Sequence, residues 1–289
     1  MPEETTVSSR PDRELKKKII TPGDYNVVPY EDSRCKVTIT NLKCTNESGD
    51  CAVDPESQVF SAQFNGIVLI GDLDSFIDKD FELILQQMCN GEVCEATMTY
   101  RDCEGKLAAE YKFTLELKET TVEQLVSDWG WMRLYEAATH HKERGVELVK
   151  QKRMADAFRR FSKALKMLIA IEPIDLEEIP EESVKEMKEL KVKLLNNLAH
   201  CQIQYNEFEA ALDLCNRALK YDPDNIKTYY RRCVSYQGLN LYEEAWNDIQ
   251  HVLKLDPSDR AAQQKASLLK PKVDEIKTKY ANVMKKMFV

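Results

Sequence analysis

Apolar and polar residues alternate in three short stretches of the first half of the chain, at residues 36–40, 94–100 and 111–118. Strict alternation is typical of strands that bury one face in an antiparallel sheet. Between two of these stretches, apolar residues recur every three or four positions. This spacing predicts one helix that ends near Asn90-Gly91 and whose buried face holds Phe81, Ile84, Leu85 and Met88. We therefore expect a small α+β domain in which an antiparallel sheet surrounds a single helix.

The second half of the chain shows helical spacing and an internal repeat. Ala211 and Pro223 recur 34 residues later as Ala245 and Pro257. An earlier copy contains Ala157, which lies 54 residues before Ala211, so an additional stretch separates the first two copies. A period of 34 with small residues at fixed places is typical of tetratricopeptide repeat (TPR) helix pairs, each closed by a proline. Three such pairs would stack into an all-α TPR superhelix, an architecture that serves binding more often than catalysis.

These patterns predict where each part of the chain begins and ends. We expect a disordered N-terminus at residues 1–14, the α+β domain at 15–119, three TPR helix pairs at 120–257 and a C-terminal capping helix at 258–289. The loop of the insertion should lie at residues 174–180. Ser258-Asp259-Arg260 is typical of an N-cap that opens the last helix, and Pro271 should kink or break that helix.

Charge is divided unequally between the two halves. Residues 1–129 carry 13 basic and 25 acidic side chains, whereas residues 130–289 carry 28 basic and 24 acidic ones. The mildly basic repeat half favours an acidic peptide partner, and the acidic first half disfavours a nucleic acid. The acidic run from Asp72 to Asp80 lacks the glycine and the final glutamate of a calcium loop, so we interpret it as a solvated loop that leads into the helix.

The sequence disfavours metal sites, cofactors and membrane insertion. The nine cysteines form no C-x-x-C pair and the four histidines lie far from the cysteine-rich stretch, so no metal site is predicted. Since there is no glycine-rich phosphate loop and no nucleophile elbow, no cofactor is expected. No apolar run approaches the ~18 residues of a membrane span, and the first residues lack a signal-peptide core. We expect a cytoplasmic protein, with the nucleus as a second compartment.

Several short motifs together resemble the FKBP-type immunophilins that carry TPR repeats. The first half contains Thr21-Pro22-Gly23-Asp24, Gln87-Met88-Cys89-Asn90-Gly91-Glu92 and Phe113-Thr114-Leu115-Glu116-Leu117. The C-terminal segment carries Tyr280-Ala281-Asn282, a signature of that family, and the first repeat is followed by an insertion, as in the family. The resemblance implies an FKBP-like N-terminal domain followed by a TPR superhelix, and it points to the divergent, FKBP-like group of the family.

The resemblance places the family's prolyl-isomerase pocket on a degenerate set of residues. The family's tryptophan floor corresponds to Phe81 and its strand tyrosine to Ile39, while the loop at residues 101–106 is shortened. Asp78 and Asp80 introduce charge where the family has an isoleucine and a glycine. The degenerate pocket comprises Ile39, Ile77, Asp78, Phe81 and Phe113. This set predicts a binding domain that lacks isomerase activity; an active isomerase with an atypical pocket is the alternative.

The resemblance also implies a clamp for the carboxylates of an acidic C-terminal peptide. Its expected positions are Lys142, Asn197, Lys227 and Arg231, each on the first helix of a repeat. Val146 stands where many clamps have an asparagine, so one donor is missing. Charge-assisted hydrogen bonds to two carboxylates would hold the C-terminal peptide of a heat-shock chaperone of the 90-kDa class. The resemblance implies a second partner, a client protein kinase of the casein-kinase-I type.

The C-terminal helix carries an apolar stripe with lysines around it. We expect Tyr280, Met284, Met287 and Phe288 to contact a partner or the last repeat. Calmodulin binding is an alternative, because basic amphipathic helices are typical calmodulin targets. The sequence thus predicts a non-catalytic co-chaperone or adaptor that links a client to a heat-shock chaperone. A pure scaffold with a vestigial clamp is the remaining alternative.

Overall fold

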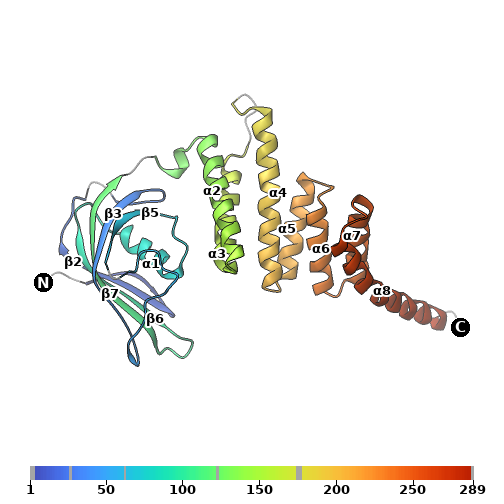
Figure 1. Cartoon of the computed structure of the whole chain (residues 1–289), viewed down its shortest axis with the longest axis horizontal. Coiled ribbons are helices and arrows are strands. Elements are labelled where there is room, and N and C mark those ends of the chain that lie inside the picture. Colours follow the sequence, from blue (N-terminus) through green and yellow to red (C-terminus); the bar gives the residue numbers. More distant parts are fainter. Residues whose placement is uncertain (1–3, 26–27, 62, 122–123, 174–177, 288–289) are drawn as a thin grey trace. The chain divides into compact units, whose positions relative to one another are not determined.

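The computed structural model describes residues 4–287 apart from 26–27, 62, 122–123 and 174–177. The chain divides into two units, Met1–Trp129 and Gly130–Val289, which are described separately (Figure 1). The first unit is built on a β-sheet and the second on helices, as the sequence predicts. None of the described helices is long and apolar enough to cross a bilayer.

Within its described residues, the first unit holds a seven-stranded antiparallel sheet and one α-helix. The elements are β1 (Glu4–Arg10), β2 (Arg13–Thr21), β3 (Arg34–Asn46), β4 (Gly49–Asp50), β5 (Phe64–Leu69), α1 (Phe76–Leu85), β6 (Val93–Arg101) and β7 (Leu107–Thr121). The strands follow the order β1-β2-β6-β7-β3-β4, and β5 pairs with β3. Residues 102–106 close the hairpin between β6 and β7, so the connection is short, as predicted.

The buried face of the sheet follows the alternation seen in the sequence. On β3, Cys35, Val37 and Ile39 are fully buried and the residues between them are not. Phe81 and Leu85 of α1 belong to the same hydrophobic core, and α1 lies against the curved sheet (Figure 1). The predicted arrangement of an antiparallel sheet around one helix is therefore confirmed.

Helix α1 is shorter than the apolar pattern predicts. It ends at Leu85 and not near Asn90-Gly91, because the segment that follows is bonded to the sheet. Gly91 has a φ of +76° and donates its N–H to the carbonyl of Leu117 at 2.7 Å. The glycine thus forms the turn into β6, while Met88 stays buried in the core.

The predicted disorder of residues 1–14 is wrong for residues 4–14, and residues 1–3 lie outside the described part of the chain. Strand β1 pairs antiparallel with β2 over most of its length, from Glu4 opposite Lys18 to Arg10 opposite Arg13. Its side chains are exposed or half-buried, so β1 has no apolar stripe that would mark it as a strand in the sequence. Backbone pairing with a neighbouring strand, which composition does not show, orders this segment.

Two buried residues of β2, Arg13 and Lys17, are charged, and each forms a buried ion pair. Lys17 Nζ lies 2.7 Å from a carboxylate oxygen of Glu92, and Arg13 pairs with Asp80. Asp80 also accepts a hydrogen bond from the hydroxyl of Tyr100 at 3.0 Å. Pairing of this kind is what makes buried charge tolerable.

The acidic run before and within α1 is buried, so its interpretation as a solvated loop is wrong. Asp74, Asp78 and Asp80 are each 1% exposed or less. The sequence pattern misleads here because the donors that compensate Asp80 lie on β2 and β6, far away along the chain.

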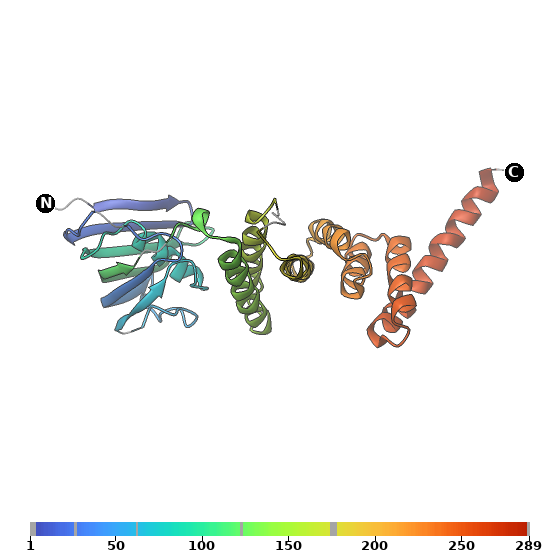
Figure 2. The same cartoon turned by 90° about the horizontal axis from the view of Figure 1, so that it is seen from above.

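The second unit is a series of helices, each packed on the next (Figures 1 and 2). The helices are α2 (Trp131–Lys150), α3 (Met154–Ala170), α4 (Glu181–Gln204), α5 (Phe208–Tyr221), α6 (Ile226–Gly238), α7 (Tyr242–Leu255) and α8 (Arg260–Met287). In the described part of this unit, α2 to α7 form three consecutive pairs and α8 packs on α7. The all-α TPR architecture is confirmed.

Small residues allow these helices to approach closely. Ala157, Ala211 and Ala245 are fully buried at the packed helix faces. A Cβ atom at Gly145 of α2 would lie 2.5 Å from the ring of Phe161 on α3. Close packing of α2 on α3 therefore depends on the absence of a side chain at Gly145.

Pro271 does not break the last helix, since α8 continues through it. Buried Leu269 and Val273 flank the proline, and their burial favours continuation over the missing hydrogen bond.

Along the chain, the first unit ends at Trp129 and the second begins at Gly130, beyond the predicted boundary at 119–120. Strand β7 already extends past that boundary, to Thr121 opposite Arg34 of β3. Most of the predicted insertion loop, residues 174–177, lies outside the described residues.

We expect Gly145→Ala to lower the free energy of unfolding by about 1–3 kcal/mol, because overpacking against Phe161 outweighs the ~1 kcal/mol that alanine gains in a helix. Urea denaturation followed by circular dichroism measures the change. Glu136→Ala, at an exposed position of the same helix, is the control and should be neutral or slightly stabilising. Equal stability of the Gly145→Ala variant and the wild type would contradict the packing argument.

Candidate functional site

The first helix of each repeat contributes polar side chains to one cavity of the second unit. Lys142 of α2, Asn197 of α4, and Lys227 and Arg231 of α6 all line a cavity of about 530 Å³. The structure thus brings together the four residues that the family resemblance assigns to a carboxylate clamp. Repeat geometry explains this, because equivalent positions of successive repeats face the same groove.

Two neighbouring arginines on α6 differ in their partners. Arg232 binds both carboxylate oxygens of Asp248, at 2.8 and 2.7 Å, and its guanidinium lies 5.1 Å from the ring centre of Tyr229. Arg231 is half-buried, and among the described residues no carboxylate forms an ion pair with it. Burial lowers the pKa of the Arg231 guanidinium. A half-buried cation without a counter-ion is unfavourable, so this site is complementary to an anion.

The sequence-based assignment missed further charged residues that line the same cavity. Lys193 lies one helical turn before Asn197 on α4, and Asp222 and Asp224 lie between α5 and α6. The cavity therefore has four cationic side chains against two carboxylates. The i, i+4 spacing of Lys193 and Asn197 could have revealed the lysine, but an exposed lysine on a helix is too common to be singled out.

A buried hydrogen-bond network fixes the start of α6 against α4. The side chains of Asn196 and Thr228 exchange hydrogen bonds at 2.8 and 3.1 Å. Asn225 caps α6 by accepting the N–H of Thr228 at 3.0 Å. Because Asn196 precedes Asn197 and Thr228 follows Lys227, this network holds two clamp residues in register.

Val146, where the family resemblance expects an asparagine, is half-buried on α2 one turn after Lys142. Its side chain has no donor, so Lys142 is the polar residue that α2 contributes to the described lining of the cavity. A ligand in this groove receives one hydrogen bond fewer from α2 than a complete clamp would give.

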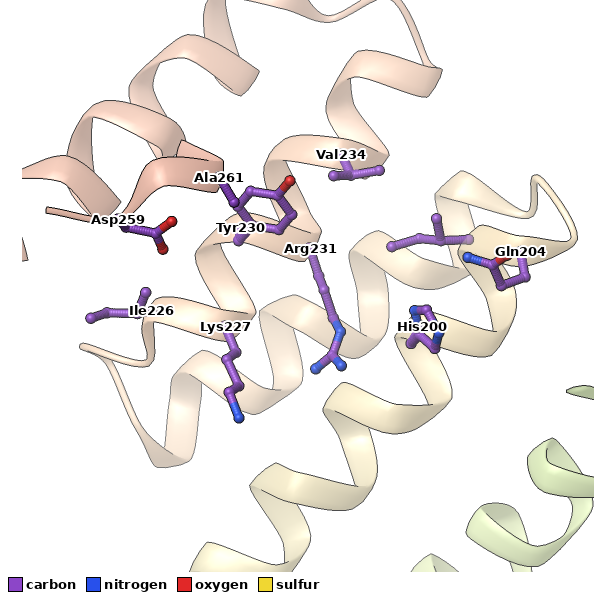
Figure 3. Close-up of a pocket in the computed structure, with 10 residues that line it drawn as sticks. His200, Gln204, Ile226, Lys227, Tyr230, Arg231, Val234, Asp259 and Ala261 are labelled. Atoms are coloured by element: carbon purple, nitrogen blue, oxygen red, sulfur yellow. The ribbon is translucent and has the colours of Figure 1, made fainter. Parts of the chain in front are cut away.

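A second cavity of about 500 Å³ adjoins the first one at Ile226, Lys227 and Arg231. Figure 3 shows Arg231 extending from α6 toward His200 of α4, with Lys227 beside it. The remaining lining is mostly apolar and includes Ile203, Tyr230, Val234 and Ala261. Burial and the Arg231 charge lower the pKa of the His200 imidazole.

The predicted isomerase-pocket residues of the first unit come together, but they are buried. Ile39 and Phe81 are 0% exposed and Phe113 is 3% exposed, with Ile77 packed against the same core. Phe60, 4% exposed, lies among the aromatic rings, and its ring centre is 5.6 Å from that of Phe81 and 5.0 Å from that of Phe113. Phe60 therefore packs against two of the aromatic residues that the resemblance assigns to the pocket.

Asp78 anchors the loop that carries Phe60. Its carboxylate accepts hydrogen bonds from the Ser57 hydroxyl and from the N–H of Gln58 at 2.7 Å. Burial raises the pKa of the Asp78 carboxyl, and these hydrogen bonds oppose the rise. The charged residue that the resemblance marked as foreign to the pocket therefore helps to close it. Phe60 was missed because nothing in its local sequence indicates that it meets Phe81 and Phe113.

The C-terminal half of α8 presents apolar side chains to solvent. Tyr280 is 66% exposed and Met284 is 52% exposed. The side chain of Met287 and the whole of Phe288 lie outside the described residues. The predicted partner contact of this stripe stays a prediction.

Comparisons with known proteins agree with this two-part architecture. Residues 9–123 match a family model described as "BDBT FKBP like N-terminal", and residues 192–225 match the tetratricopeptide repeat model. The chain is 31% identical over 159 residues to FK506-binding protein 59 of Drosophila melanogaster. The aligned part covers 54% of this chain and 34% of that protein. The chain is also 30% identical over 146 residues to the Hsp70/Hsp90 co-chaperone CNS1 of Saccharomyces cerevisiae, covering 50% and 34%.

A solved structure shares the fold. The crystal structure of residues 1–211 of CG17282 covers 72% of this chain and 97% of its own, with a TM-score of 0.55 and 24% identity. The chain spans about a third of the length of the two relatives named above. Fold and groove define a protein with an immunophilin-type α+β unit and a TPR unit. More particularly, the chain has an FKBP-like N-terminal unit followed by TPR repeats and is similar to FK506-binding proteins over part of their length.

We expect Arg231→Met and Arg232→Met to differ in their effects on stability. Arg232→Met leaves Asp248 buried without its partner and should cost about 2–4 kcal/mol. Arg231→Met removes a half-buried charge that has no counter-ion, so stability should stay within ~1 kcal/mol of the wild type or rise. Urea denaturation of both variants is the measurement. A large loss in Arg231→Met would mean that this arginine has a structural role.

Proposed function

We propose that this protein is a non-catalytic co-chaperone or adaptor whose TPR groove binds an acidic C-terminal peptide of a heat-shock chaperone of the 90-kDa class. The observation that supports this most is Arg231, a half-buried cation without a carboxylate partner among the described residues, which lines the groove. Lys227 and Asn197 line the same cavity. The groove is therefore suited to an anion that comes from outside the chain.

The charge of the cavity favours a terminal aspartate. Four cationic side chains, partly offset by Asp222 and Asp224, leave a net positive site. A C-terminal aspartate has two carboxylates, one on its side chain and one at the chain end. Lys142 and Asn197 approach from α2 and α4, while Lys227 and Arg231 approach from α6, so both carboxylates can receive charge-assisted hydrogen bonds.

The relatives support the same partner class. CNS1, with which this chain shares 30% identity over 146 residues, is named as an Hsp70/Hsp90 co-chaperone. The second part of the proposal concerns the client protein that the adaptor would bring to the chaperone. A kinase of the casein-kinase-I type is proposed from the family resemblance alone, as are the cytoplasm and, secondarily, the nucleus as the place of action.

The FKBP-like domain acts in this proposal as an interaction module and not as an isomerase. Prolyl isomerisation has to overcome a barrier of ~18–20 kcal/mol, which requires a site that holds the twisted bond. Phe60 packs against Phe81 and Phe113, and Asp78 ties down the loop of Phe60. Phe60, Phe81 and Phe113 are each 4% exposed or less, so these three rings offer a proline little surface.

Binding is tested by calorimetric titration with an N-acetylated Met-Glu-Glu-Val-Asp peptide. We expect micromolar affinity that falls about 10- to 100-fold in Arg231→Met, because a hydrogen bond to a charged group contributes about 1.5–3 kcal/mol. Lys254→Met, a charge removal on α7 outside both cavities, should bind like the wild type. A peptide amidated at its C-terminus should bind more weakly. Failure of the wild type to bind would leave a pure scaffold with a vestigial clamp.

Isomerase activity is tested with a chromogenic proline peptide. We expect the rate with the purified protein to equal the uncatalysed rate, because Phe81 and Phe113 are buried and in contact with Phe60. An active FKBP protein, measured in parallel, is the positive control. Acceleration that Phe81→Ala abolishes would support the alternative of an active isomerase with an atypical pocket.

A further inference from the structure

His200 faces the groove from the same helix as Asn197. It lies three residues after Asn197 on α4 and lines the second cavity together with Arg231 (Figure 3). Its ring is half-buried, and no hydrogen bond to the ring is formed within the described part of the chain. The clamp assignment did not include this histidine.

The surroundings of His200 are mainly cationic and apolar. Lys227, Tyr230 and Arg231 of α6 line the same cavity as His200, as does Asp259 just before α8. On its own helix, burial raises the pKa of the neighbouring Cys201 thiol to about 11, so that group is neutral. Apolar walls strengthen electrostatic interactions within the cavity.

These surroundings favour the neutral form of the imidazole in the free groove. Burial is the larger cause and the Arg231 charge the smaller cause of the lowered pKa of His200. An anion bound at Arg231 would counteract the effect of the Arg231 charge on the pKa of His200, because the negative charge of the anion favours a proton on the ring. The imidazolium could then donate a hydrogen bond to that anion.

We propose that His200 is a further ligand-binding residue of the groove, which holds a carboxylate of the acidic peptide jointly with Arg231 and takes up a proton from solvent when the peptide binds. This inference rests on the proposed function of the groove. The carboxylate meant here is an acidic side chain that precedes the last residue, because the second cavity extends away from Lys142 and Asn197. His200 thereby supplies a donor in a clamp that lacks one at Val146.

The sign of the pH effect follows from this linkage. The pKa of His200 is lowered in the free protein and should rise in the complex. Binding should therefore strengthen as the pH falls through the pKa of His200 in the complex, and it should level off below the pKa of His200 in the free protein. Peptide carboxylates have pKa values of ~4 and stay ionised throughout. N-acetylation removes the peptide's own amine from the titration.

The test is calorimetric titration of the full chain with the N-acetylated peptide at several pH values. We expect the wild type to bind at least about threefold more tightly at about pH 6 than at about pH 7.5, within the limit of about tenfold per pH unit for one proton. Titration in two buffers with different ionisation enthalpies should show proton uptake. In His200→Gln, both the pH dependence and the proton uptake should be lost.

His251→Gln is the matched control. His251 lies on α7 and lines neither cavity, although its Nε2 is 3.9 Å from a carboxylate oxygen of Asp224, so it is a histidine outside the proposed binding site. The pH dependence should survive in this variant. Binding with the same pH dependence in wild type and His200→Gln, or loss of the dependence in His251→Gln, overturns the inference and leaves the proposed function intact. Absence of peptide binding at every pH overturns both.

Discussion

Close approach of neighbouring helices is the constraint on which the groove depends. Gly145 against Phe161 and Gly238 against Phe208 leave no room for a Cβ atom, and buried alanines occupy the equivalent faces of the other helices. The first helices of successive pairs are thereby held near one another, and α4 contacts α6 directly through Asn196 and Thr228. Residues far apart in the sequence can then act on one ligand. Without this packing, each clamp cation would be an isolated surface charge of little energetic value.

Several buried charges in the described part of the chain have a partner, and Arg231 contrasts with them. Lys17 pairs with Glu92, Arg232 with Asp248 and Lys191 with Glu172. A buried charge that loses its partner is costly, so folding alone favours such pairs. Arg231 is half-buried on the same helix as Arg232 and has no carboxylate partner among the described residues. Its position is understandable if the missing charge belongs to a ligand.

Sequence periodicity predicted those features that depend on local order. The period of 34 residues defines equivalent positions in the repeats, and the family resemblance assigns Lys227 and Arg231 to the groove, where both line the cavity. Features that arise from distant segments could not be predicted. Phe60 meets Phe81 only because Asp78 holds its loop, and β1 is ordered by pairing with β2. Neither pairing leaves a periodic signal in its own segment.

Burial has opposite consequences in the two units. In the FKBP-like domain, most of the residues assigned to the degenerate isomerase pocket are buried, and Asp78 among them accepts hydrogen bonds from donors of its own chain. In the TPR groove it restricts water around Arg231 and His200 without supplying a counter-ion. A covered aromatic cluster has no remaining unsatisfied group for a substrate, whereas an uncompensated cation does. The same physical rule therefore favours an anion in the groove of the helical unit, and it accounts for the burial of Phe81 and Phe113 in the sheet unit.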